Sequence, residues 1–134
     1  MARNQIPDAL GMRRLKYDPE TPDADRERMA TTLLAADRRS EAILLYEGRP
    51  QSPALKGILA KAIQDGSTFH VLSIRRMGVP VTDEQVRACG VAAEAKGRWF
   101  DAHRAYAALS DEAALARVRE QLPGYKPAVP ANKV

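Results

Sequence analysis

Cysteine and histidine are the side chains of this chain best suited to nucleophilic or acid–base chemistry, and few of them occur. Cys89 is the single cysteine, and the two histidines are His70 and His103. Asp101 precedes His103 by two positions, but residues two apart on a helix point to different faces and cannot form a hydrogen-bonded catalytic pair there. We therefore interpret His103 as a surface or boundary residue.

Cys89 and His70 keep one enzymatic hypothesis open. A cysteine acts as a nucleophile where a base lies near it in space, and the small residues around Cys89 are more typical of a buried core position. No ligand at metal-binding spacing accompanies His70, and the sequence holds no glycine-rich phosphate loop or serine elbow. We expect a non-catalytic protein without metal or cofactor. An enzyme centred on Cys89 or His70 is an alternative hypothesis.

Arginines occur in adjacent pairs at 13–14, 38–39 and 75–76. Arginine captures phosphate or carboxylate groups with two hydrogen bonds, so pairs that cluster in space would form an anion-binding surface. Alternatively, each pair lies at a solvated helix end, where cations oppose the negative pole of the helix dipole. We favour helix ends, because no aromatic residues that could stack on bases are interleaved with these pairs.

The net charge of +4 is concentrated at the ends of the chain. Residues 1–17 carry +3 and residues 119–134 carry +2, which leaves −1 for the rest. A nearly neutral body with basic ends differs from the basic face that nucleic-acid binders usually present. A nucleic-acid-associated helical protein that uses its basic termini is therefore an alternative, not the favoured, hypothesis.

The composition is that of a globular protein of one domain. The 134 residues are 45% hydrophobic and 28% charged, and the apolar residues are mainly alanine and leucine with only 5% aromatics, which favours close-packed helices. The start of the sequence has no apolar leader, no run approaches the length of a membrane span, and a single cysteine cannot form an internal disulfide. We expect a cytoplasmic protein of bacterial type.

Proline and glycine divide the chain into three segments. We predict an extended basic arm over residues 1–22, a helical-hairpin domain over 23–122 and a proline-rich tail over 123–134. Apolar spacing and stop signals predict about seven helices in the domain, within 22–39, 40–50, 52–66, 67–81, 82–97, 98–109 and 110–122. Because the turns between them are short, successive helices are expected to be antiparallel.

The helix signals differ in strength along the domain. Thr82 and Gln85 have the spacing of a capping box, the strongest start signal in the chain. We also expect Ser40 and Ser110 to cap helices. Residues 67–77 are compatible with a helix or a strand, and a helix is favoured because a lone strand would leave its backbone groups without partners.

The stretch EAKGRWFDAHRAY, residues 94–106, places a glycine turn directly before an aromatic-rich helix. Trp99, Ala102, Tyr106 and Leu109 share one face of that helix. Ala102 is small enough to let two helix backbones approach, while the rings fill the space beside it. We therefore interpret these aromatic residues as packing between helices and not as a ligand cage.

This pattern resembles the tetratricopeptide repeat, a helix–turn–helix unit of about 34 residues, over residues 83–116. The positions that carry the resemblance are Gly90, Gly97, Trp99, Ala102 and Tyr106. A weaker match covers residues 23–56, where Ala42 and Tyr46 stand sixty residues before Ala102 and Tyr106. In the better match over residues 83–116, Ala114 stands where the family has a proline near the end of the unit. Because sixty is not a multiple of the family period, we expect a shorter or irregular middle hairpin.

The resemblance implies an all-α fold, built as a short right-handed stack of antiparallel helical hairpins. It also implies a concave groove, lined by the first helix of each unit, that binds a peptide or a partner protein. The residues implied for this groove are Glu84, Arg87, Val91 and Glu94 in one unit and Glu27, Thr31 and Leu34 in the other. We further expect the arm to contact a partner through Arg13, Arg14, Leu15 and Tyr17. The function that follows is a small adaptor or an assembly subunit of a larger complex.

Overall fold

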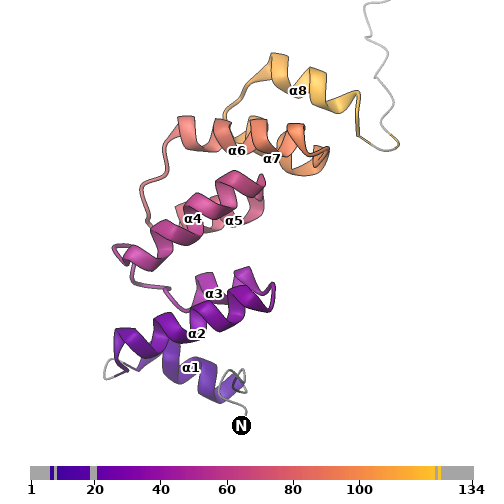
Figure 1. The fold of residues 1–134 in the computed structure, drawn as a ribbon. Helices are drawn as coiled ribbons and strands as arrows, with labels where there is room; N and C mark the ends of the chain where they lie inside the picture. Colours follow the sequence, from indigo (N-terminus) through magenta and orange to yellow (C-terminus); the bar gives the residue numbers. More distant parts are fainter. Residues whose placement is uncertain (1–6, 8, 19–20, 123, 125–134) are drawn as a thin grey trace, which may run out of the picture. The chain divides into compact units, whose positions relative to one another are not determined.

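The computed structural model describes residues 7, 9–18, 21–122 and 124, and these residues form an all-α protein (Figure 1). The helices are α1 (Ala9–Tyr17), α2 (Asp23–Ala35), α3 (Arg39–Leu44), α4 (Pro53–Asp65), α5 (Thr68–Arg76), α6 (Asp83–Ala95), α7 (Trp99–Ala108) and α8 (Glu112–Arg119). No strand occurs among the described residues, which confirms the predicted all-α class. The segment that was compatible with a helix or a strand forms α5. Apart from residue 124, the predicted tail lies outside the described residues.

The chain divides into two compact units that share α4 and α5. The first unit consists of residues 1–61 and 72–80, and the second consists of residues 62–71 and 81–134. The first unit therefore holds α1, α2, α3, most of α4 and the C-terminal half of α5. The second holds the turn between α4 and α5 together with α6, α7 and α8.

A helix, α1, lies where the sequence analysis predicted an extended arm. The prediction is wrong for this segment because the prolines that suggested an arm stand at positions 7, 19 and 22, outside a run that contains several good helix formers. Lys16 of α1 forms an ion pair with Glu47, and its carbonyl accepts a hydrogen bond of 2.8 Å from Nη1 of Arg49. These two contacts attach α1 to the segment that follows α3.

The core of the second unit is built on α7, which contacts both α6 and α8. One cluster of buried residues in this core consists of Ala93, Ala102, Tyr106, Ala114, Leu115 and Val118, and Trp99 and Leu109 pack against it. Gly90 of α6 faces α7 so closely that a Cβ atom added there would lie 3.1 Å from both Ala105 Cβ and Tyr106 Cε1. The absence of a side chain at Gly90 is therefore what lets α6 and α7 approach.

Of the three helix caps predicted from the sequence, one is confirmed and two are wrong. The capping box is present, since the Gln85 N–H donates to Thr82 Oγ1 at 3.1 Å and the Thr82 N–H donates to Gln85 Oε1 at 2.9 Å. Asp111 caps α8 in place of Ser110, whose backbone is left-handed with a φ of 54° and ends the preceding turn. Ser40 does not cap α3, because that helix begins one residue before it.

The hairpins α2–α3 and α6–α7 have the same backbone design at an offset of sixty residues. Their first helices begin and end at equivalent positions, and each is followed by a left-handed residue, Asp37 with φ 60° and Gly97 with φ 70°. The next N–H, of Arg38 or Arg98, then donates a hydrogen bond of 2.8 Å back to a carbonyl near the end of the first helix. Asp37 can replace the glycine because aspartate is among the residues that tolerate this conformation. The turn between α4 and α5 has the same geometry at Gly66, about midway between the two.

Candidate partner-binding groove

Two adjoining hollows lie on the surface of the first unit. One, of about 470 Å³, lies between α2 and α4, and the other, of about 490 Å³, lies between the start of α2 and the loop that precedes α4. Glu27, Tyr46 and Pro53 line both hollows, so together they form one depression, which we call the first-unit groove. Its further lining includes Thr31, Leu34, Ala54, Gly57, Ile58 and Lys61 in the first hollow and Asp23, Arg49 and Gln51 in the second.

One face of α2 forms a wall of the groove. Glu27, Thr31 and Leu34, the three residues that the resemblance implied for a groove in this unit, all line the first hollow. Their spacing of four and three positions places them on the same side of the helix. The neighbouring side of α2 buries Arg26 and Leu33 in the core of the unit. The helix therefore presents a mixed polar and apolar face to the groove.

Tyr46 contributes a buried polar group to the floor of the groove. Its side chain is only 2% exposed, and its hydroxyl has no hydrogen-bond partner within the described part of the chain. Burial, followed by the negative charge of Glu27, raises the pKa of Tyr46 to about 12. A buried hydroxyl without a partner costs about 1–3 kcal/mol of folding free energy. The floor of the groove thus holds a group that gains from an additional partner.

Arg26 is a charged residue in the core that the sequence analysis did not single out. It is 1% exposed, and its Nη1 atom donates to Asp23 Oδ1 at 2.9 Å. A buried cation of this kind requires a paired anion. Asp23 therefore has a role within the unit, although it also lines the second hollow. The apolar stripe of α2 gave the only sequence signal, because Arg26 occupies a position of that stripe.

In the second unit, hydrogen bonds and an ion pair join the residues at the positions equivalent to those that line the first hollow. Tyr106, which stands sixty residues after Tyr46, donates from its hydroxyl to Glu94 Oε1 at 2.6 Å. Arg117 of α8 reaches the same carboxylate with Nη2 at 2.7 Å and Nε at 3.1 Å, and its Cζ atom lies 5.8 Å from the centre of the Tyr106 ring. The Arg117 hydrogen bonds, then the hydroxyl of Tyr106, hold the pKa of Glu94 below its ordinary value against the effect of burial. The Tyr106 hydroxyl therefore has a hydrogen-bond partner, and the side chains of Glu94 and Arg117 occupy the place that is open in the first unit.

The equivalent positions of the first unit lack this bridge. Sixty residues before Glu94 stands Leu34, and sixty residues before Arg117 stands Gly57. Both residues line the first hollow. Replacement of a carboxylate by an apolar side chain and of an arginine by a glycine explains why the Tyr46 hydroxyl has no partner and why the hollow is open.

A second bridge distinguishes the two units in the same way. Arg87 Nη1 donates to Asp111 Oδ2 at 2.8 Å, which ties α6 to the start of α8. The equivalent residues in the first unit are Glu27 and Gln51, and both line the second hollow. No hydrogen bond or ion pair to the Glu27 carboxylate occurs within the described residues. Both hollows of the first-unit groove therefore correspond to positions that ion pairs cross in the second unit.

The other residues predicted to contact a partner have several environments. In the second unit, Glu84 and Val91 are exposed, whereas Arg87 and Glu94 take part in the two bridges just described. The three predicted groove residues of the first unit therefore lie together in one hollow. Of the four predicted in the second unit, two form hydrogen bonds and ion pairs to other residues of that unit.

The arm residues lie on or beside α1. Arg13 and Tyr17 line a separate hollow of about 570 Å³ between α1 and α3. The carbonyl of Arg14 accepts hydrogen bonds from the Asp18 N–H at 2.9 Å and from the Thr21 hydroxyl at 3.2 Å, so it helps to end the helix. The side chain of Leu15 lies outside the described part of the chain.

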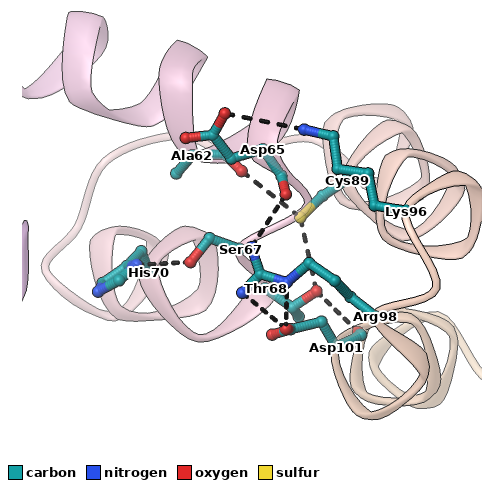
Figure 2. Close-up of polar contacts among 9 residues, drawn as sticks. All are labelled: Ala62, Asp65, Ser67, Thr68, His70, Cys89, Lys96, Arg98 and Asp101. Carbon is teal, nitrogen blue, oxygen red and sulfur yellow. Dashed lines mark hydrogen bonds and ion pairs between the residues drawn. The ribbon is translucent and has the colours of Figure 1, made fainter.

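Cys89 belongs to a cluster that fastens the turn between α4 and α5 to α6 and α7 (Figure 2). Its Sγ atom lies 3.5 Å from Thr68 Oγ1 and 4.0 Å from the carbonyl oxygen of Ala62. Thr68 in turn donates to the carbonyl oxygen of Asp101 at 2.7 Å. Burial raises the pKa of the Cys89 thiol, the reverse of the change that activates a catalytic cysteine.

The remaining members of this cluster also hold the turn in place. Arg98 Nη1 donates to the carbonyl oxygen of Asp65 at 3.1 Å (Figure 2). Lys96 Nζ donates to the carbonyl oxygen of Gln64 at 2.9 Å, so two cations complete the hydrogen bonds at the end of α4. His70 Nδ1 lies 2.5 Å from Ser67 Oγ, within the first turn of α5. The contacts of this cluster hold the turn between α4 and α5 against α6 and α7, which is a structural role.

Comparisons with family models, with curated proteins and with solved structures found no match to this chain. None of the helices in the described ranges is long and apolar enough to cross a bilayer. Within those same ranges, no group of three or more histidine, cysteine, aspartate or glutamate side chains is placed to hold a metal ion.

Proposed function

We propose that this chain is a non-catalytic interaction module that binds a segment of a partner protein in the first-unit groove. The observation that carries the proposal is the contrast between the two units: the groove is open over a buried, unpartnered Tyr46 hydroxyl, while the equivalent place in the second unit is filled by Glu94 and Arg117. A position that one copy of a structural design fills and the other leaves open is a natural place for an external ligand.

The architecture that accords with this function is a tetratricopeptide-like stack of helical hairpins. The shared backbone design of α2–α3 and α6–α7 and the recurrence of its turn at Gly66 support a repeat protein. In such proteins the first helix of a unit lines the binding surface, and α2 has this place in the first-unit groove. A protein of this size with an open groove suits a role as a small adaptor or assembly subunit.

The experiment uses a variant that closes the groove as the second unit closes its own. In Leu34→Glu/Gly57→Arg, the two substitutions reproduce Glu94 and Arg117. The new arginine has room, because a Cβ atom added at Gly57 has no other atom within 4 Å, and Leu34 is 39% exposed. Ala108→Glu/Ala116→Arg adds the same charges at exposed positions of α7 and α8 and serves as the matched control.

The tagged full chain and both variants are used to capture partners from the cells that carry the protein, with and without nuclease. We expect a protein that binds the wild type and the control after nuclease treatment and is absent from the closed variant. Equal capture by the closed variant would exclude the groove as the site. Capture that disappears on nuclease treatment would favour the nucleic-acid hypothesis instead.

A further inference from the structure

The charge left uncommitted in the first-unit groove is negative. Of the two carboxylates that line the second hollow, that of Asp23 is bonded to Arg26, but that of Glu27 has neither a hydrogen bond nor an ion pair within the described residues. Of the cations at the rim, Arg49 donates to the carbonyl oxygen of Lys16, and Lys61 has a partner of its own. The group that remains available to a ligand is therefore the carboxylate of Glu27.

Glu27 lies beside Tyr46, whose buried hydroxyl also lacks a hydrogen-bond partner within the described residues. It lines both hollows together with Tyr46, and it is close enough for its charge to disfavour ionisation of the Tyr46 hydroxyl. A carboxylate and a neutral phenol side by side can both accept hydrogen bonds. The ligand group that satisfies both at once is a cation with several N–H donors.

The second unit shows which cation the design accommodates. Arg117 approaches Tyr106 with its guanidinium over the ring and donates two hydrogen bonds to a carboxylate that also receives the tyrosine hydroxyl. In the first unit the tyrosine is retained, while the arginine is replaced by Gly57 and leaves open space. A guanidinium with its fixed fork of donors fits a pair of adjacent acceptors better than an ammonium does.

The walls of the first hollow indicate what flanks this cation. Leu34 and Ile58 line the hollow from α2 and α4, and Gly57 exposes helix backbone between them without a side chain. The apolar part of this hollow can accommodate small or aliphatic side chains of an extended chain. Together with Glu27, it recognises a basic residue next to apolar ones.

We propose that the first-unit groove binds an extended peptide segment of the partner through an arginine, whose guanidinium pairs with Glu27 beside Tyr46 while neighbouring apolar side chains pack against Leu34 and Ile58. This inference rests on the proposed function and names the chemical class of its ligand. The arginine of the partner lies beside Tyr46 as Arg117 lies beside Tyr106, and it pairs with Glu27 because Leu34 stands in the place of Glu94.

The test is a selection of random peptides displayed on phage against the immobilised full-length chain. Peptides that also bind the closed variant Leu34→Glu/Gly57→Arg are removed, so that those retained depend on the groove. We expect the retained peptides to share an arginine next to apolar residues. The best peptide is then titrated by calorimetry into the wild type, Glu27→Gln and a control, Glu120→Gln, which removes the same charge from the exposed residue that directly follows α8.

We expect Glu27→Gln to weaken binding about tenfold, because it removes one side of a charge-assisted hydrogen bond, and the control to have no effect. Raising the salt concentration should weaken binding to the wild type more than binding to Glu27→Gln. Groove-dependent peptides without a basic residue, or an arginine peptide that binds Glu27→Gln with unchanged affinity, would overturn the ligand class and leave the proposed function standing. A selection that yields no groove-dependent peptide at all would overturn both.

Discussion

The two buried tyrosines should respond in opposite directions to the same substitution. Tyr106→Phe removes the hydrogen bond of 2.6 Å to Glu94, an acceptor that is charged. Hydrogen bonds to charged groups contribute about 1.5–3 kcal/mol, and we expect a loss near 1.5 kcal/mol, because the Glu94 side chain is partly open to water and keeps its bonds to Arg117. Tyr46→Phe removes a hydroxyl without a partner, so the unliganded protein should become more stable by about 1 kcal/mol.

The assay is urea unfolding at neutral pH, followed by circular dichroism for the whole chain and by fluorescence for the second unit, which holds the single tryptophan, Trp99. Wild type and both variants should have similar slopes, since neither substitution changes the buried apolar surface much, and differ in the midpoint. The reasoning would be refuted if Tyr46→Phe destabilised the protein as much as Tyr106→Phe does. That result would mean that the Tyr46 hydroxyl is bonded in the free protein and that the groove lacks the group on which the proposal depends.

Three further outcomes follow from the contacts described above. In urea unfolding, Gly57→Ala should stabilise the protein by about 0.5–1 kcal/mol, because an added Cβ atom there has open space around it. Gly90→Ala should destabilise it by about 1–3 kcal/mol, because the added Cβ atom would lie 3.1 Å from atoms of α7. Equal effects of the two substitutions would contradict the packing of Gly90 against α7. Cys89, buried and with a raised pKa, should react with a thiol reagent such as DTNB at a rate that rises with urea, and rapid reaction of the folded protein would contradict its burial. Burial raises the pKa of both tyrosines to about 12, with a further contribution from the charge of Glu27 for Tyr46 and from the hydrogen bond to Glu94 for Tyr106. The folded state therefore keeps these two protons to a higher pH than the unfolded state does, and the free energy of unfolding should fall between about pH 10 and 12. Absorbance at 295 nm should show two tyrosines that ionise at high pH, and the variant Tyr46→Phe/Tyr106→Phe should lose them and depend less on pH.

Much of the helical framework could be predicted from local signals. The capping box at Thr82, the turn at Gly97 and the apolar stripe that contains Tyr106 each depend on residues a few positions apart, and each is present in the structure. The turn at Asp37 was harder to recognise, because the left-handed conformation that glycine adopts elsewhere is taken by aspartate there. The arm was misjudged because prolines outside α1 were taken to exclude a helix within it.

The open groove could not be predicted from any single segment. In the second unit three residues from α6, α7 and α8 meet in one bridge, and their separation in sequence hides the relation between them. Arg87 and Glu94 have the chemistry of a binding surface, yet Asp111 and Arg117 engage both within the unit. The offset of sixty residues was visible, but its meaning depends on knowing which side chains touch.

The measurement that tests the account most directly is the affinity of the captured partner for the wild type and for the closed variant Leu34→Glu/Gly57→Arg, together with the urea midpoint of each. The account predicts that the closed variant is at least as stable as the wild type, because its new ion pair reproduces the bridge of the second unit over Tyr46, and that it no longer binds the partner. A closed variant that is equally stable and binds with unchanged affinity would contradict the claim that the first-unit groove is the binding site.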